Sequence, residues 1–524
     1  MLFTSYNFIA FLIVIFLLYY LVPKKFQWVL LLAGSYFFYA CAGIHFLAYI
    51  FATTVTTWWA AKRMTAIQQE QAAYLKAHKA ELDREQKKAY KAGMKKRTRH
   101  WMLTCLLFNL GILAVIKYTD FMISNINSIF HTGLTFMNFA LPMGISFYTF
   151  QSMGYLIDVY RAKYPCQDSL PKFALFVSFF PQLVQGPISR YDALSQTLYE
   201  EHSLDWNNIR FGLQRILWGF FKKLLVADRL VVAVKALVGS PEEYTGAYVV
   251  LAVFFYAIQL YADFTGGIDI TIGIAEVFGI RVTENFIRPY FSKNINEYWT
   301  RWHITMGTWF KDYIFYPISV CGWMLKLSKW SREKLGKEAG KRVPVYLANI
   351  VVWFTTGLWH GASWNFIVWG MLNCVVTLVS YELEPLYARF HEKVPAASGR
   401  WYDGFQAIRT FWIMGFIRIL DCYRDVPLTF HQVGTVFTTG NWGSMFTGIS
   451  ALGLGVADYG VILFGAVMMF LVSLKGRSGS VRKQLAEKSV PVQVIVWFLL
   501  FFSILILGAY GVGYDSNQFI YNQF

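Results

Sequence analysis

The sequence predicts an all-α polytopic membrane protein, and three observations carry this prediction. The chain of 524 residues is 56% hydrophobic and only 15% charged, whereas soluble domains carry about 25% charged residues. Apolar runs recur from end to end, and most match the roughly 17 to 25 residues that a helix needs to cross the hydrocarbon core. The basic residues gather between these runs. Because lipid cannot satisfy backbone polar groups, we expect each spanning run to be helical.

Twelve apolar runs are the candidate spans. They lie at 8–22, 26–44, 45–61, 101–117, 141–160, 209–227, 247–265, 346–360, 364–381, 405–421, 456–474 and 491–510. The stretches 173–186 and 268–280 are apolar but shorter than a span. We interpret them as re-entrant or interfacial segments.

The first run is a retained span rather than a signal peptide. A signal peptide has its basic residues before the apolar core, whereas Lys24 and Lys25 follow it here. Basic residues flanking a span are expected to face the cytoplasm. The N-terminus is therefore expected to lie outside the cell.

Three basic segments are predicted to be cytoplasmic by the positive-inside rule. Residues 62–100 carry twelve Lys and Arg against four acidic residues and are rich in Ala, Glu, Lys and Gln, so we expect a helical arm there. The segments 325–345 and 475–488 are basic as well. The last span then runs outward and leaves the tail 511–524 outside.

The net charge of +17 follows from these segments and indicates membrane orientation rather than nucleic-acid binding. The same charge is compatible with attraction of a phosphate-bearing cytoplasmic donor. The six cysteines show no pair spacing, so neither a disulfide framework nor a metal site is expected.

His360 interrupts the apolar run from Tyr346 to Tyr381, which is too long for one span. Within GLWHGASWN, Gly361 suits the position after a helix, and Ser363 or Asn365 suits the start of the next. We expect two helices that meet at a break, with His360 ending the first. An ionisable group there is a functional candidate, and burial would keep its imidazole neutral. The alternative is a histidine that caps helix carbonyls.

His303 lies in residues 294–318, which show helical periodicity. One face of this predicted helix carries Trp299, His303, Met306, Phe310 and Tyr313, and the other carries Arg301, Thr305, Thr308 and Asp312. The alternative is a helix on the membrane surface, with its aromatic residues anchored at the headgroups.

Other polar insertions point to a protein-lined interior. The stretch 179–191 places Pro, Gln and Gly in an apolar run and ends near Arg190. The stretch 261–280 contains Asp263, Asp269 and Glu276, and we expect Gly266–Gly267 to break any helix there. For each carboxylate the alternative is a helix cap or an ion pair. Nucleotide-binding and hydrolase motifs such as the P-loop, HExxH and GxSxG are absent from the sequence.

Together these stretches resemble the membrane-bound O-acyltransferase family, in its bacterial branch of alginate O-acetyltransferase-like proteins. The matching pieces span most of the chain in the family's order: SYFFYA (35–40), LPMGISFYTFQSMGYLIDVYR (141–161), FPQLVQGPISRY (180–191), YADFTGGIDITIGIAEVFGI (261–280), NEYWTRWHITMGTWFKDYIFYP (296–317) and TGLWHGASWNFIVWG (356–370). The sequence departs from the family in a longer arm at 62–100. It also has Thr300 where many relatives have a second arginine.

The resemblance implies one membrane domain over 1–524, in which about 11–12 transmembrane helices, with re-entrant or interfacial helices, form a ring around a central tunnel. It places His360 at the catalytic position, as general base, and His303 at the second polar position. The donor substrate would be a cytoplasmic acyl thioester, with acetyl-CoA favoured, and no cofactor or metal would be bound. Weaker candidates for donor or tunnel contacts are Arg301, Lys311, Asp312, Trp359 and Asn365.

The resemblance also implies an enzyme of the plasma or inner membrane, embedded in lipid, that supplies acetyl groups for O-acetylation of an extracellular or cell-wall polysaccharide. A separate SGNH-type transferase outside the cytoplasm would be the partner. One alternative is D-alanyl transfer to teichoic acid, and another is a non-catalytic transporter or channel with a proton-relay histidine. The ending FIYNQF (519–524) is either an aromatic anchor or, by similarity to the acyl-carrying partner peptide of D-alanylation systems, a carrier with Tyr521 as first acyl acceptor.

Overall fold

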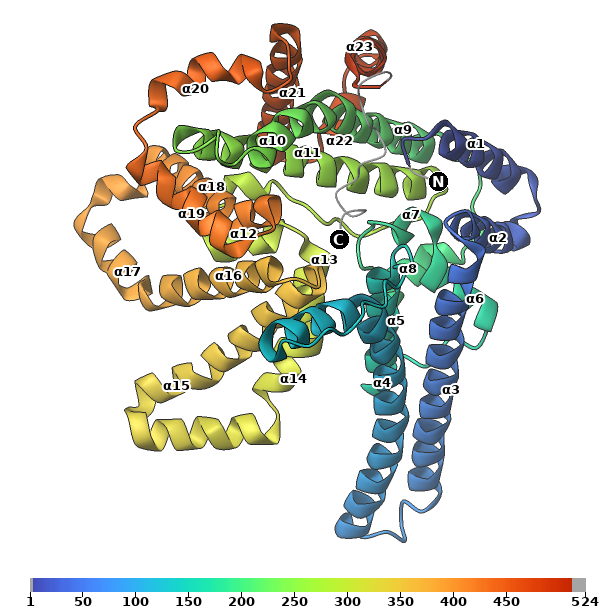
Figure 1. Ribbon diagram of the computed structural model, residues 1–524. Coiled ribbons are helices and arrows are strands. Elements are labelled where there is room, and N and C mark those ends of the chain that lie inside the picture. The colour runs from blue at the N-terminus through green and yellow to red at the C-terminus, as the bar shows by residue number, and fades with distance from the viewer. Residues whose placement is uncertain (1–2, 511–524) are drawn as a thin grey trace. The chain divides into compact units, whose positions relative to one another are not determined.

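The computed structural model describes residues 3–510, which form helices joined by loops, with a single isolated β-bridge between Phe286 and Trp302 (Figure 1). The fold is therefore all-α, as predicted. The chain divides into two compact units. Unit 1 comprises residues 1–209 and 275–283, and unit 2 comprises residues 210–274 and 284–524.

Unit 1 contains the N-terminal helices. They are α1 (Tyr6–Leu21), α2 (Gln27–Ala40), α3 (Leu47–Ala77), α4 (Arg84–Phe130), α5 (Ile145–Tyr160), α6 (Leu170–Ser178), α7 (Phe180–Leu183) and α8 (Tyr191–Leu198), with short 3₁₀ turns at Lys24–Phe26 and Ile44–Phe46. The stretch 173–186, expected to be too short to span, falls in the short buried helices α6 and α7. The Ser35 hydroxyl accepts a hydrogen bond from the Phe180 amide (3.1 Å), which satisfies a donor at the start of α7.

The basic segment 62–100 lies in a long hairpin in which α3 and α4 run side by side (Figure 1). Asp83 starts α4 through a capping box, because its carboxylate accepts from the Gln86 amide (2.7 Å) while the Gln86 side chain accepts from the Asp83 amide (3.0 Å). Nearer the apolar half, Asn109 donates to Thr56 (3.1 Å) across the two helices. Such polar bonds hold neighbouring helices together where lipid supplies no hydrophobic drive.

Unit 2 contains the remaining helices. They are α9 (Trp206–Phe221), α10 (Asp228–Gly239), α11 (Ala247–Val277), α12 (Ile295–Arg301), α13 (Ile304–Phe310), α14 (Tyr316–Ser319), α15 (Gly322–His360), α16 (Trp364–Glu382), α17 (Glu384–Lys393), α18 (Arg400–Tyr423), α19 (Val426–Thr438), α20 (Trp442–Gly448), α21 (Val456–Lys475), α22 (Val481–Ala486) and α23 (Val490–Leu507). Two π-helical turns, η3 (Lys222–Ala227) and η5 (Lys311–Phe315), follow α9 and α13.

The expected helix break at Gly266–Gly267 is wrong, because α11 continues to Val277. The glycines serve close packing instead. A Cβ on Gly219 would lie 2.6 Å from the Gly266 carbonyl oxygen, and one on Gly273 would lie 2.7 Å from that of Gly212. Small residues of this kind allow two helix backbones to approach closely. The stretch 268–280 is accordingly not a separate re-entrant segment.

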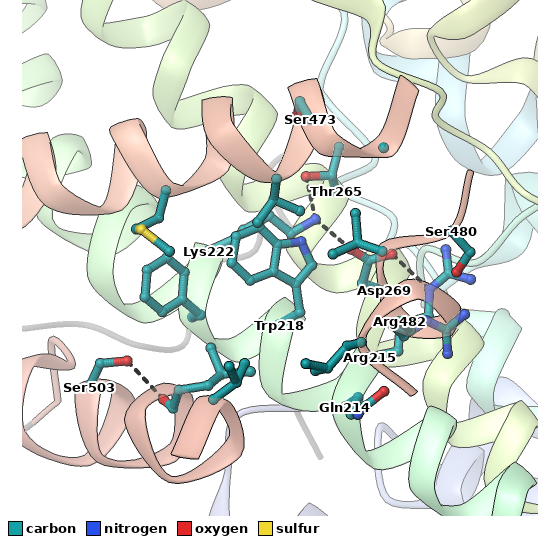
Figure 2. A pocket seen from close by; sticks show the side chains of 18 of the residues that line it. Gln214, Arg215, Trp218, Lys222, Thr265, Asp269, Ser473, Ser480, Arg482 and Ser503 are labelled. Carbon is teal, nitrogen blue, oxygen red and sulfur yellow. Dashed lines mark hydrogen bonds and ion pairs between the residues drawn. The ribbon is translucent and has the colours of Figure 1, made fainter. Parts of the chain in front are cut away.

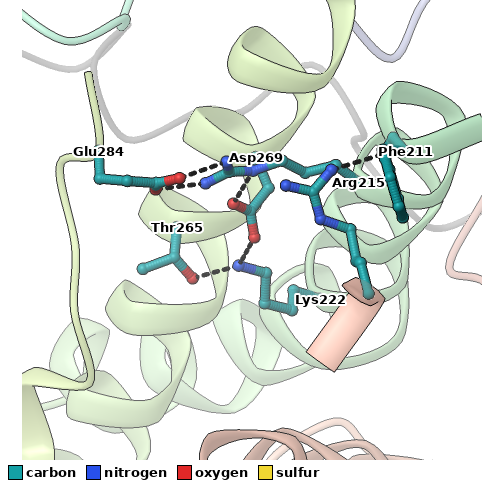
Figure 3. A network of polar contacts seen from close by, with 7 residues as sticks. Phe211, Arg215, Lys222, Thr265, Asp269 and Glu284 are labelled. Atoms are coloured by element: carbon teal, nitrogen blue, oxygen red, sulfur yellow. Dashed lines mark hydrogen bonds and ion pairs between the residues drawn. The ribbon is translucent and has the colours of Figure 1, made fainter. Parts of the chain in front are cut away.

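Ion pairs, most of them buried, connect α9 and the π-helical turn η3 with α11 and the residues next to them (Figure 3). Asp269 accepts from Lys222 (2.6 Å) and from Arg215 (2.9 Å), and Arg215 also pairs with Glu284 (2.5 Å). The neighbouring Lys223, fully buried, contacts two further carboxylates, Asp228 and Asp263, each at 2.6 Å. The ion-pair alternative for Asp263 and Asp269 is therefore confirmed. We call these seven charged residues the α9–α11 charge layer.

The predicted basic loop at 325–345 is helical instead, since it lies within α15. The chain turns back at Gly336, whose left-handed backbone (φ 82°) favours glycine. The two arms pack tightly, because a Cβ on Gly340 would lie 2.4 Å from the Arg332 backbone, and the Ser331 hydroxyl donates to the Gly340 carbonyl (2.8 Å). The Lys- and Glu-rich composition of this segment suits a helix.

Five helices among the described residues are long and apolar enough to cross a membrane: α4, α11, α16, α21 with its following turn, and α23. The apolar helix α1 has 16 residues and falls just short. Several other predicted spans form helices shorter than expected, such as α2 and α5 with 14 and 16 residues. The chain is thus a multi-pass membrane protein.

Candidate active site

His360 lies where two helices meet, as the sequence predicts. It is the last residue of α15, and α16 begins at Trp364. Gly361 follows in an extended conformation (φ −170°) rather than the left-handed one expected of a glycine after a helix. The position requires glycine because there is no room for a side chain: a Cβ would lie 2.2 Å from the Phe366 ring. Ser363 precedes α16, but its hydroxyl contacts the Asn365 side chain instead of capping the backbone.

Aromatic rings surround the half-buried imidazole of His360. Trp369 of α16 lies nearest, with ring centroids 4.7 Å apart and the rings steeply inclined. The rings of Trp359 (5.0 Å) and Phe366 (6.4 Å) complete the enclosure. The imidazole is therefore held at the helix break against apolar faces, with partial access from outside.

His303 does not lie on a continuous helix, so that part of the prediction is wrong. Helix α12 ends at Arg301, Trp302 is extended, and His303 is left-handed (φ 50°) before α13 begins. A residue other than glycine in this conformation costs on the order of 1–3 kcal/mol and persists where its surroundings hold it. His303 is only 1% exposed. Its side chain is therefore enclosed by protein.

Asn285 holds the break at His303. Its backbone carbonyl accepts from the Ile304 amide (3.0 Å), and its side-chain oxygen accepts from both the amide (3.0 Å) and the hydroxyl (2.9 Å) of Thr305. The Asn285 amide group lies 3.3–3.4 Å from the Nδ1 atom of His303. Because the Asn285 oxygen is already occupied, the pattern assigns Asn285 Nδ2 as donor to Nδ1, which leaves the proton of His303 on Nε2.

The surroundings of His303 keep its ring neutral. Burial, and then the charge of Arg418, lowers the pKa of His303 to about 3. Phe264 (5.0 Å) and Phe286 (6.3 Å) border the ring. At physiological pH this imidazole is a neutral hydrogen-bonding group.

One indole ring contacts both histidines. The Trp359 ring lies 5.9 Å from the His303 ring and 5.0 Å from the His360 ring, measured between centroids. Trp359 is 5% exposed. The structure thus brings the two predicted histidines and the predicted lining residue Trp359 into one cluster, although 57 positions separate the histidines.

Arg418 of α18 adds a buried cation to this cluster. Its guanidinium lies over the rings of Trp302 (4.3 Å), Trp299 (5.7 Å) and Trp369 (5.7 Å). An ion pair with Asp421 is longer, at 3.7 Å. The sequence reasoning missed Arg418, although an arginine within the apolar run 405–421 was a usable signal.

The other residues predicted to contact the donor or line the tunnel are Asn365, Arg301, Lys311 and Asp312. Asn365 is 1% exposed and donates to the Leu420 carbonyl (3.3 Å), so it ties the start of α16 to α18. Arg301 pairs instead with Glu297 (2.5 Å), and the exposed Lys311 lies over the Tyr316 ring (5.7 Å). Asp312 is half-buried in the π-helical turn η5.

Tyr521 lies outside the described residues. Within them, no group of three or more His, Cys, Asp or Glu side chains could hold a metal ion, and all six cysteines are unpaired.

Comparison with known proteins agrees with this geometry. Residues 101–423 match the model of the membrane-bound O-acyltransferase family. The chain is 31% identical over 455 residues to the probable alginate O-acetylase AlgI of Azotobacter vinelandii, covering 84% of this chain and 79% of that protein. It is 29% identical over 409 residues to the peptidoglycan O-acetyltransferase of Helicobacter pylori (73% and 69% covered). It is 25% identical over 284 residues to the teichoic acid D-alanyltransferase of Bacillus subtilis (52% and 67% covered).

The family match contains both histidines, the helix break and Arg418, since all lie between residues 101 and 423. The two longer alignments are to proteins named for O-acetyl transfer. The prediction of an enzyme is thereby confirmed over a non-catalytic transporter or channel. The chain belongs to the membrane-bound O-acyltransferase family and is an O-acyltransferase.

Proposed function

We propose that this O-acyltransferase moves an acetyl group from cytoplasmic acetyl-CoA towards an extracytoplasmic polysaccharide. The observation that carries the proposal is the pair of imidazoles, His303 and His360, which are set at two helix breaks and both lie next to the Trp359 ring. Two relatives whose names specify O-acetyl transfer to alginate or peptidoglycan support the acetyl group and the glycan acceptor.

His360 acts as the general base. Its ring removes the proton from the acceptor hydroxyl while that oxygen attacks the thioester carbonyl. As the tetrahedral intermediate collapses, the C–S bond breaks and the protonated ring returns its proton to the departing CoA thiolate. Enclosure by Trp359, Trp369 and Phe366 supports this role, because the three rings hold the imidazole in place at the helix break.

His303 orients the acceptor or stabilises the oxyanion, and its own ring stays neutral throughout. A ring with a pKa of about 3 accepts no proton at neutral pH, but its Nε2–H can donate to the acceptor oxygen or to the oxyanion that forms. The bonds from Asn285 and the positive φ hold the ring in one orientation before substrate arrives. Preorganised donors of this kind need no rearrangement during the reaction.

The basic segments assign the sides of the membrane. With 62–100, 325–345 and 475–488 in the cytoplasm, the N-terminus and the tail 511–524 are extracytoplasmic, and the donor arrives from the basic side. Delivery to the polymer then falls to an SGNH-type partner.

The topology can be tested with cysteines introduced at 62–100. They should resist labelling by an impermeant maleimide in intact cells, and labelling there would show that the topology is the reverse of the proposed one.

Tyr521 is the proposed first acceptor before the partner. An acetyl ester on its phenol is reactive enough to pass on, as a relay requires. Mass spectrometry after incubation with acetyl-CoA should find an acetyl adduct on Tyr521. Tyr521→Phe removes only the hydroxyl and should stop delivery, so full polymer acetylation by this variant would return the tail to a plain membrane anchor.

The second candidate function is D-alanyl transfer to teichoic acid. It is favoured by the similarity to the Bacillus subtilis D-alanyltransferase, which covers 52% of this chain at 25% identity. The acetyl proposal ranks first because its relatives align over 73–84% of the chain at higher identity.

The test uses the purified full-length protein in nanodiscs with an acceptor hydroxyl. Acetyl-CoA carrying a labelled acetyl group, and a carrier protein loaded with labelled D-alanine, are supplied separately. Release of free CoA thiol with transfer of labelled acetyl supports the proposal. Transfer from the alanyl carrier alone would instead establish the second candidate.

A further inference from the structure

A large cavity in unit 2 lies apart from the histidines (Figure 2). Its volume is about 1210 Å³, above the roughly 300–1,000 Å³ of ordinary small-molecule sites. Neither His303 nor His360 lines it. Its walls are mainly apolar side chains of α9, α21 and α23, among them Trp218, Phe221, Phe464, Met468, Leu500 and Phe502. We call it the α23 cavity.

Helix α23 faces this cavity rather than a packed protein core. None of its residues is buried, although it is apolar enough to cross a membrane. The face of α23 towards the cavity is broad and comprises Val496, Trp497, Leu499, Leu500, Phe502, Ser503, Ile506 and Leu507. A spanning helix that packs directly on its neighbours buries such a face. The space beside α23 therefore suits flexible apolar chains.

One side of the cavity is polar and carries excess positive charge. Figure 2 shows Arg215, Asp269 and Arg482 gathered on that side. The lining contains four cations (Arg215, Lys222, Arg288, Arg482) and two anions (Asp269, Glu284), so the charges sum to +2. Arg215 and Lys222 pair with those two carboxylates within the α9–α11 charge layer. Arg288 and Arg482 are the two further cations of the lining.

Arg288 and Arg482 are placed to receive an anion. Within residues 3–510, the Arg288 guanidinium has no hydrogen bond or carboxylate partner, and only its backbone carbonyl accepts bonds. Burial, and then the charges of Arg301 and Arg477, lowers the pKa of Arg288. Arg482 is oriented by a bond to the Phe211 carbonyl (2.7 Å) and by its position over the Phe211 ring (5.8 Å).

A second cavity of about 970 Å³ begins at the same place. It shares Tyr261, Arg288 and Ser473 with the α23 cavity, and its other charged lining residues are Lys293, Arg400, Asp403 and Arg477. Arg288 thus lies where the two cavities meet, close enough to Arg477 for the charge of Arg477 to lower its pKa. Basic pockets between helices on the cytoplasmic side are typical sites for anionic lipid headgroups, and 475–488 is a segment expected on that side.

We infer that the α23 cavity binds an anionic phospholipid of the surrounding membrane, with its phosphate at Arg288 and Arg482 and its acyl chains along α21 and α23. The lipid then fills the space between α23 and the rest of unit 2. It is a structural ligand, independent of the acyl donor and of the acceptor.

The test measures lipid selectivity directly, without an activity assay. Full-length protein is exchanged into nanodiscs of phosphatidylglycerol and phosphatidylcholine in equal amounts, released into mild detergent, and examined by native mass spectrometry. We expect phosphatidylglycerol to be retained preferentially. Removing both arginines in Arg288→Gln/Arg482→Gln should lower that preference roughly 25-fold, since each basic group at a lipid surface contributes about fivefold.

Lys483→Gln is the matched control, because Lys483 is an exposed cation of the same short helix α22 that does not line the cavity. This variant should retain phosphatidylglycerol like the unaltered protein. Equal retention of the two lipids by the unaltered protein would overturn the inference whether or not the double variant folds. Displacement of retained phosphatidylglycerol by free CoA would also overturn it, since the cavity would then be a donor site.

Discussion

Two regions of unit 2 bury basic side chains, and they compensate the charge in different ways. In the α9–α11 charge layer each cation meets carboxylates at 2.5–2.9 Å. At the histidine site, Arg418 meets three indole faces, and its one carboxylate lies at 3.7 Å. A carboxylate neutralises the positive charge of its partner at short range. Indole faces neutralise it only in part, so the electric field of Arg418 still acts on neighbouring groups.

The difference separates a region built for stability from one arranged for chemistry. Charges paired within the layer have little effect beyond it, so its loss should affect folding. The incompletely cancelled charge of Arg418 reaches His303 and, after burial, is the second cause of its lowered pKa. The comparison therefore predicts that changes at the histidines alter rate, and that changes in the layer alter stability.

The largest expected effect is on rate at His360. Removing a general base typically costs about 10² to 10⁴-fold in turnover, so His360→Ala should reduce acyl transfer by that factor. Thermal unfolding and membrane insertion should stay close to those of the unaltered protein, because His360 is half-buried at a helix end. Near-normal turnover would remove His360 from the mechanism.

The next effect is on stability in the charge layer. Lys223→Met leaves two buried carboxylates, Asp228 and Asp263, without their shared cation. Breaking such a group typically costs about 3–5 kcal/mol, measured here as the loss in free energy of unfolding in detergent. Combining it with Asp228→Leu and Asp263→Leu should restore much of that loss, because an all-apolar replacement leaves no uncompensated charge. A triple variant as unstable as Lys223→Met would contradict this account.

Substitutions at His303 should also change the rate of acyl transfer rather than the stability of the protein. His303→Ala removes a hydrogen-bond donor, which typically costs about 10² to 10³-fold at an oxyanion. His303→Asn should be less impaired, because an amide retains a donor. The measurement is turnover at saturating acyl donor for both variants. Equal activity in the two variants would show that the ring does not donate to the reacting atoms.

The smallest effect is a pH dependence of stability. The folded-state pKa of His303, about 3, lies below the unfolded value of about 6.5. The unfolded chain therefore binds a proton that the folded chain does not, and His303 lowers stability as pH falls below 6.5. The slope is about 1.4 kcal/mol per pH unit. Unfolding curves at pH 7, 6 and 5 should show this slope relative to His303→Asn. Parallel curves for the two proteins would contradict the burial of a neutral ring.

The break at His360 was predictable because its signals are local. The length of the apolar run and the order of Gly361, Ser363 and Asn365 lie within a few residues of each other. The glycines of α11 show the limit of such reasoning. A glycine pair signals either a helix break or a close helix contact, and only the position of Gly212 and Gly219 on another helix decides between them.

The conformation of His303 was not predictable, because its cause is distant in sequence. Helical periodicity over 294–318 is real, but Asn285 takes the bonds that would continue the helix through Ile304 and Thr305. Arg418 could have been noticed as a charge within an apolar run, but its indole partners, which come from α12, α16 and the residue that follows α12, required the fold. The two histidines were recognised from the sequence, whereas their partners required the fold.

The hairpin of α3 and α4 has a practical consequence for imaging. With 47 residues, α4 extends about 70 Å at 1.5 Å per residue, more than twice the roughly 30 Å of a hydrocarbon core. Its basic first half must therefore stand clear of any detergent micelle as a rod braced by α3. The hairpin is thus a rigid marker outside the detergent, suited to an antibody fragment and to particle alignment in electron cryo-microscopy.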